Sequence, residues 1–167
     1  MVLTKAELIS ALQNEVRILL HLATKVDRAQ LDFRPTPKQR STLELLRYLS
    51  CMGPVLLKAT RAGAFDPAAW TAELQAAEAR DFDGTIDTIA AMSDSFALLL
   101  DEMVDNEFRQ DIEMFGRRSS KGAFLVNTVL AGYAAYRTQL FVYLKVCGRH
   151  ELSTMNLWVG MDAPGAA

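Results

Sequence analysis

Residues 4–26 read TKAELISALQNEVRILLHLATKV, and this stretch decides the fold class. It begins with Thr4 and Glu7 in the S/T-x-x-E spacing of a capping box, in which two side chains bond reciprocally to backbone N–H groups at a helix start. Apolar residues then recur every three or four positions, as a single buried helix face requires: Leu8, Leu12, Val16, Leu19, Ala23 and Val26. The pattern predicts an amphipathic helix that ends near Asp27, before a loop that carries Pro35 and Pro37.

The same start signal recurs at residues 41–44, STLE, ahead of a second apolar run. The apolar face of this second helix consists of Leu45, Leu46, Leu49, Met52, Leu56 and Leu57. Gly53 and Pro54 lie inside the run. Because a proline removes one helical hydrogen bond and crowds the preceding turn, we expect a kink or a break at about residue 53.

Two further long helices are predicted beyond residue 82. The third begins at residues 83–85 and ends near residues 105–106, and a polar connection follows from Glu107 to Lys121. The fourth runs from about Ala123 to Val146, and it should be the most buried helix because its first half is apolar nearly all round. The tail from Met161 to Ala167 is expected to be extended.

These elements define one fold class. No stretch alternates between apolar and polar residues as a half-buried strand would. The chain is therefore predicted to be all-α, a four-helix bundle with up-down-down-up topology or a close variant. Its second helix is kinked, and a long connection between helices 2 and 3, about residues 63–82, holds a short helix from about residue 69 to residue 79. With 167 residues, the chain should form a single domain, 1–167.

Composition excludes several classes of protein. The net charge of −2 offers no excess of cations for phosphates, so no nucleic-acid partner is expected. The uncharged stretch from residue 122 to residue 136 is shorter than the roughly 20 residues of a membrane-spanning helix, and the first 17 residues carry charges throughout, unlike a signal peptide. Two cysteines cannot form a disulfide framework, which favours a reducing, cytoplasmic location.

The sequence is poor in residues that carry chemistry. Its two histidines, His21 and His150, form no HExxH or ExxH motif, and no CxxC is present, so we expect no metal and no cofactor. Cys51 and Cys147 have no histidine or cation cluster beside them, which favours inert thiols. The basic run around Ser119 could hold an anion, although a solvated turn is the simpler interpretation.

Three segments together resemble the DinB-like superfamily of four-helix bundles. LDFRP at residues 31–35 resembles the family's L-x-[WF]-R-P connection, ELLRYL at residues 44–49 resembles E-L-L-x-H-L, and YRTQLFVYL at residues 136–144 resembles H-R-G-Q-L-x-x-Y-L. The resemblance implies a metal site made by one histidine of the second helix and an i, i+4 pair of the fourth. The corresponding residues here are Tyr48, Gly132 and Tyr136, none of which is a histidine.

The resemblance therefore implies the fold without the family's metal chemistry. We expect a non-catalytic bundle that binds a small molecule or a partner, with a vestigial site at Tyr48, Gly132 and Tyr136 that Gln139 and Met52 also line. Two alternatives stay open: a metal-independent enzyme that uses the tyrosines of this pocket, and a metal-dependent hydrolase or thiol transferase with an unconventional site. A homodimer is expected, because family members commonly dimerise and the first and fourth helices are rich in apolar residues.

Overall fold

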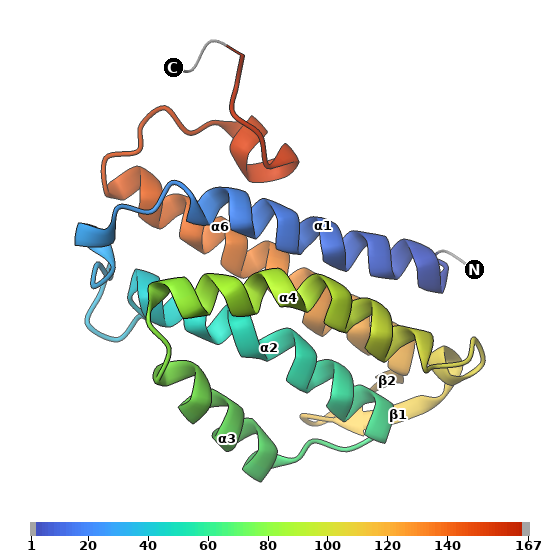
Figure 1. The fold of residues 1–167 in the computed structure, drawn as a ribbon. Coiled ribbons are helices and arrows are strands. Elements are labelled where there is room, and N and C mark those ends of the chain that lie inside the picture. Colours follow the sequence, from blue (N-terminus) through green and yellow to red (C-terminus); the bar gives the residue numbers. More distant parts are fainter. Residues whose placement is uncertain (1–2, 165–167) are drawn as a thin grey trace.

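Four long helices form the bundle in a computed structural model that describes residues 3–164. They are α1 (Lys5–Ala23), α2 (Thr42–Ala62), α4 (Phe82–Asp101) and a last helix built from α5 (Lys121–Phe124), the π-helical segment η3 (Leu125–Leu130) and α6 (Ala131–Val146). Figure 1 shows α1 and α6 running in one direction and α2 and α4 in the other. The predicted all-α fold is confirmed, and so is its up-down-down-up order.

The connection between α2 and α4 explains this topology. It contains α3 (Pro67–Glu78), which lies along α2 and returns the chain to the end where α2 began (Figure 1). Asp66 caps its first turn through the N–H groups of Ala68 and Ala69, and Pro67 occupies the first helical position, where no N–H is needed. Because α3 brings the chain back to that end, α4 runs in the same direction as α2.

Both predicted capping boxes are present. Thr4 and Glu7 exchange their two hydrogen bonds at the start of α1, and Ser41 and Glu44 do the same at the start of α2. These local signals fix where each helix begins, because they satisfy N–H groups that the first turn would otherwise leave without partners.

Helix α2 is continuous through Pro54, so of the two outcomes expected near residue 53, a kink or a break, the break does not occur. The buried hydroxyl of Tyr133 on α6 accepts a hydrogen bond from the Gly53 N–H at 3.2 Å and donates one to the Leu49 carbonyl at 3.0 Å. A hydroxyl inserted between two backbone groups one turn apart keeps both satisfied beside the proline. Residue 53 must be glycine here, since a Cβ atom would lie 2.3 Å from the Tyr133 hydroxyl oxygen.

The polar connection before the last helix contains a β-hairpin that the sequence did not predict. Strands β1 (Asp111–Met114) and β2 (Arg117–Ser120) pair antiparallel around a two-residue turn, Phe115–Gly116, in which both residues have positive φ. Ile112 and Met114 turn inward and pack with Ala59 and Phe124. This small apolar cluster attaches the hairpin to the bundle.

The C-terminal segment covers α1 and α6. The π-helical turn η4 (Met155–Val159) follows α6, where the sequence suggested no element, and contacts both helices. Arg17 donates to the Val159 carbonyl at 2.8 Å, and Lys25 pairs with Asp162 at 2.7 Å. The expected extended tail is described only as far as residue 164, and residues 165–167 lie outside the described residues.

Two short 3-10 turns complete the chain as described, η1 (Arg28–Gln30) and η2 (Glu107–Arg109). In the part of the chain that the structure covers, none of the helices combines the length and apolarity needed to cross a bilayer.

Candidate functional site

The residues that the resemblance places at metal-ligand positions, Tyr48, Gly132 and Tyr136, lie together between α2 and α6. Tyr48 on α2 and Tyr136 on α6 pack edge to face with ring centroids 5.1 Å apart. Trp70 of α3 packs against the other side of Tyr48, with centroids 6.0 Å apart, and the Arg40 guanidinium lies over the Tyr48 ring at 3.9 Å. The position is therefore occupied by an aromatic cluster from three helices with a cation stacked on it.

Gly132 and Met52 complete this cluster. Gly132 lies one turn before Tyr136, and a Cβ atom there would be 3.3 Å from the terminal methyl of Met52 and 3.6 Å from its sulfur. Met52 is itself buried. The thioether thus lies beside Gly132, where a side chain longer than that of alanine would extend.

Burial keeps the phenol of Tyr48 protonated. Desolvation, followed by the neighbouring Tyr136 phenol, raises the pKa of Tyr48 to about 12, and Arg40 opposes this rise only weakly. Burial also raises the pKa of the nearby Cys51 thiol to about 11. Neither group is ionised near neutral pH, so neither supplies an anionic ligand or a base.

These residues do not fit the metal site that the resemblance implies. Two phenols and a glycine stand where the resemblance implies three imidazole nitrogens, the donors that zinc or nickel would need, and the Tyr48 phenol holds its proton. Within residues 3–164, the structure also brings no three His, Cys, Asp or Glu side chains together in a way that could hold a metal ion.

Gln139 and the neighbouring arginines bond elsewhere. The Gln139 amide donates to the Tyr143 hydroxyl, which in turn donates to the Arg40 carbonyl at 3.0 Å, so Gln139 supports the loop before α2 rather than the tyrosine pair. Arg47 donates to the Arg80 carbonyl at 2.7 Å. The side chain that follows Tyr136, Arg137, binds Glu15 on α1. Among the described residues, Arg40 is the only cation stacked over the ring of Tyr48 or Tyr136.

The pair formed by Arg137 and Glu15 is a buried feature that the sequence did not identify. Two hydrogen bonds of 2.7 and 3.1 Å join the guanidinium to the carboxylate, and Arg137 also donates to the Leu157 carbonyl of η4. The two side chains are only 5% and 11% exposed. The sequence contains one sign that Glu15 is buried, because Glu15 is next to Val16, a residue of the apolar face of α1.

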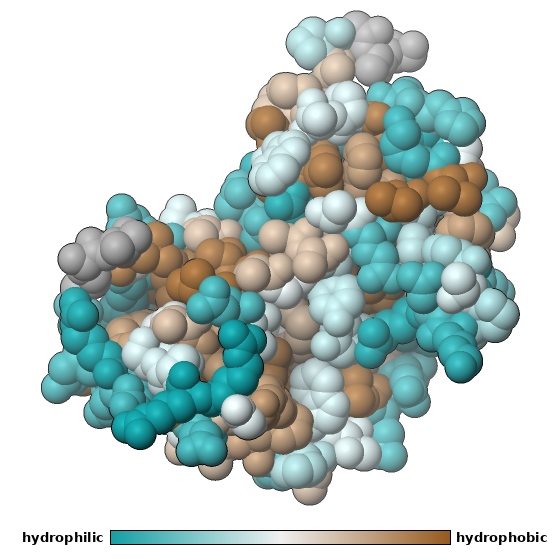
Figure 2. Space-filling view, turned by 180° about the vertical axis from the view of Figure 1, so that it is seen from behind, coloured by the Kyte–Doolittle hydropathy of each residue, from teal (hydrophilic) through white to brown (hydrophobic). Residues whose placement is uncertain are grey.

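The structure contains a second candidate site at the end of the bundle where α1 begins. A cavity of about 740 Å³ lies between the start of α1, η2 and the segment from Ser120 to Leu130. Figure 2 shows an apolar hollow between hydrophilic side chains on the side of the molecule where the chain begins. None of Tyr48, Gly132 and Tyr136 lines this cavity. It forms where the start of α1 meets two segments that come much later in the chain, η2 and the first half of the last helix. The sequence of the last helix gives one sign of it, the polar residue Asn127 within an apolar stretch.

Comparison with known proteins supports the fold. No protein-family model and no curated protein sequence matches the chain. Among solved structures, it is similar to the crystal structure of a DinB-like protein, YjoA of Bacillus subtilis, with 14% identity and a TM-score of 0.67. The similarity covers 87% of this chain and 95% of that chain. The chain therefore has the DinB-like four-helix-bundle fold, as its sequence motifs suggested.

Proposed function

We propose that this protein is a non-catalytic bundle that binds a small molecule or a partner, and that Tyr48, Gly132 and Tyr136 are the remnant of a metal site. The observation that carries the proposal is the filling of the ligand positions. Met52 packs against Gly132, and the Tyr48 phenol is half-buried with its pKa raised to about 12. Residues of this kind do not supply the nitrogen donors of the implied metal site.

The two enzymatic alternatives lack such support. A tyrosine that acts as a base near neutral pH needs a lowered pKa, whereas the pKa of Tyr48 is raised. A metal-dependent hydrolase or thiol transferase needs at least three suitable ligands, and the residues at these positions do not supply them.

Metal content and bound mass test the proposal together. The purified protein, produced with zinc and nickel present, is expected to contain neither in stoichiometric amount by elemental analysis. Native mass spectrometry is expected to show a non-covalent organic adduct that disappears from the denatured mass. One tightly held metal per chain that is lost in Tyr48→Phe or Tyr136→Phe would contradict the proposal.

The assembly and location of the protein are also proposals. We propose a homodimer that forms through α6, because Val142 and Val146 on this helix are 49% and 63% exposed. The apolar residues of α1, by contrast, are largely buried within the chain, so the predicted contribution of the first helix to a dimer lacks support. Both cysteines are free thiols, which is consistent with a cytoplasmic location.

A further inference from the structure

We infer that the cavity at the start of α1 binds a small amphipathic carboxylate, of the class of medium-chain fatty acids. The inference rests on the proposed function, since it names the place and the chemistry of the ligand of a non-catalytic binding protein. The volume of the cavity, about 740 Å³, lies within the range of roughly 300–1,000 Å³ that is typical of small-molecule sites.

The walls of the cavity suit an apolar body. Leu3 and Leu8 of the first segment face Phe108 of η2, and Val126 and Leu130 of η3 complete the wall. Leu3, Phe108, Val126 and Leu130 are only partly buried by the protein itself and pack against the main core. Apolar surface that the chain leaves partly exposed in a concavity is stabilised when a ligand covers it.

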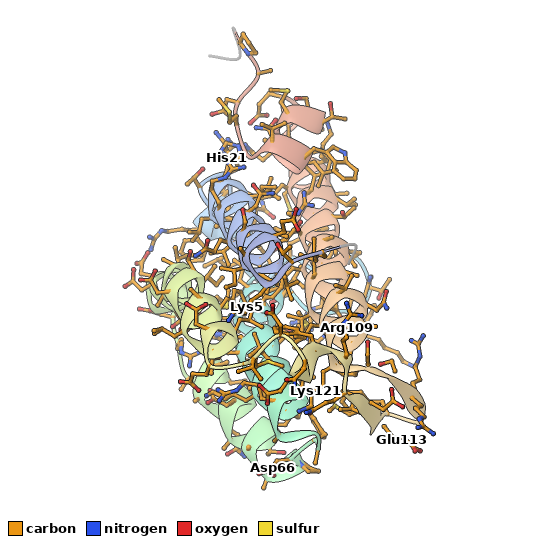
Figure 3. All side chains as sticks on the ribbon, turned by 90° about the vertical axis from the view of Figure 1, so that its right-hand side faces the viewer. Lys5, His21, Asp66, Arg109, Glu113 and Lys121 are labelled. Atoms are coloured by element: carbon orange, nitrogen blue, oxygen red, sulfur yellow. The ribbon has the colours of Figure 1, made fainter. Side chains whose placement is uncertain are left out.

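Positive charge gathers at the opening of the cavity. Arg109 and Lys5 line it together with one carboxylate, Asp105. Figure 3 looks onto this end of the bundle and shows Lys5 and Arg109 on neighbouring elements. Lys5 binds the Met103 carbonyl at 3.1 Å and lies 3.8 Å from Asp101, whereas the Arg109 side chain makes no hydrogen bond or ion pair with any described residue. An exposed guanidinium that bonds to none of the residues 3–164, beside an apolar cavity, is suited to a carboxylate, which it can bind through two parallel hydrogen bonds.

The backbone of η3 is a second, independent indication of a binding site. Residues 125–130 form a π-helical segment inside the last helix, and Val126, Asn127 and Leu130 of this segment line the cavity. Such segments are rare in proteins and occur frequently at functional sites. The exposed Asn127 amide makes no side-chain hydrogen bond within residues 3–164, so it can contribute a donor to the second carboxylate oxygen.

Titration calorimetry with decanoate tests the inference, with decanol as an uncharged probe of the same chain length. We expect decanoate to bind the wild-type protein with one site per chain and decanol to bind at least about tenfold more weakly, because charged hydrogen bonds favour the carboxylate. Arg109→Gln should weaken decanoate binding about tenfold and leave decanol binding unchanged. Ala123→Trp, which fills the cavity from α5, should abolish the binding of both probes.

Arg117→Gln is the matched control. Arg117 is an exposed arginine of the nearby hairpin that does not line the cavity, so its loss should leave both affinities unchanged. Equal binding of decanoate and decanol, no decanoate binding, or a decanoate affinity unaffected by Arg109→Gln would overturn the inference. None of these results bears on the proposed lack of metal at Tyr48 and Tyr136, whereas stoichiometric metal would overturn the proposed function without changing decanoate binding.

Discussion

Gly53 on α2 lies in close contact with Tyr133 on α6. The ideal Cβ position of residue 53 lies 2.3 to 2.8 Å from the hydroxyl and ring atoms of Tyr133, which is fully buried. Gly53→Ala should therefore destabilise the fold by about 1–3 kcal/mol, despite the better helix propensity of alanine. Thermal unfolding should register a Tm lower by roughly 2–4 °C for each kcal/mol.

A second helical glycine supplies the control for this substitution. In Gly132→Ala the new methyl group would meet only the flexible end of Met52, at 3.3 Å. Its Tm should change little in either direction. A Gly53→Ala protein as stable as Gly132→Ala would show that Tyr133 does not occupy the position described.

His21 makes the attachment of the C-terminal segment sensitive to pH. Burial lowers the pKa of His21 below 6.5, with Asp162 opposing the shift, and the Asn156 amide donates to its Nε2 atom at 3.1 Å. The folded state thus binds a proton more weakly than the unfolded state. Stability that is present above pH 6.5 should be lost as the pH falls through the pKa of the folded state.

His21→Gln isolates this contribution, because glutamine keeps an acceptor for Asn156 but does not titrate. We expect the wild-type Tm to fall more steeply than that of His21→Gln between about pH 8 and about pH 5. Parallel Tm curves for the two proteins would show that His21 does not sense pH.

Within the helices, the sequence predicted the features that neighbouring residues determine, such as where a helix begins. The capping boxes at Thr4 and Ser41 fixed two helix starts, because the donors they satisfy lie within four residues. The sequence could not show that α2 would continue through Pro54, because the hydroxyl that bridges the helix there comes from Tyr133, 80 residues away. The hairpin escaped prediction because its turn, Phe115–Gly116, lacks the usual Asn-Gly or Asp-Gly signal and its strands have only four residues each.

The two candidate sites also differ in how far the sequence could predict them. Residues 132 and 136 lie one helical turn apart, so their common face could be predicted from spacing alone. That Met52 fills the space beside Gly132 is a fact of packing between α2 and α6, which no spacing reveals. The cavity at the start of α1 depends on three separate segments and was not predicted for that reason.

A metal site restored between α2 and α6 tests whether these helices keep the family's geometry. The triple change Tyr48→His, Gly132→His and Tyr136→His would supply three nitrogen ligands and leave one position open, as zinc accepts. Because a side chain at residue 132 would meet Met52, we add Met52→Ala to make room. Zinc at 100 times its dissociation constant should then stabilise the variant by about 2.7 kcal/mol, which is visible as a higher Tm.

Two proteins without the added histidines are the controls for the zinc experiment. Wild type and Met52→Ala alone should show no zinc-dependent rise in Tm. A folded quadruple variant whose Tm is also indifferent to zinc would mean that residues 48, 132 and 136 do not correspond to the ligand positions.

For the whole molecule, the proposed dimer predicts a particle of twice 18.5 kDa in size-exclusion chromatography with light scattering. Val142 and Val146 lie one turn apart on the exposed side of α6, so a partner helix could cover both. The double change Val142→Glu and Val146→Glu should convert the dimer to a monomer, because two carboxylates would lose their hydration at the interface. Leu98→Glu on α4 introduces the same charge at a residue that is 68% exposed and should leave the mass unchanged. A wild-type particle of 18.5 kDa would show that the protein is a monomer, and dissociation by Leu98→Glu alone would move the interface from α6 to α4.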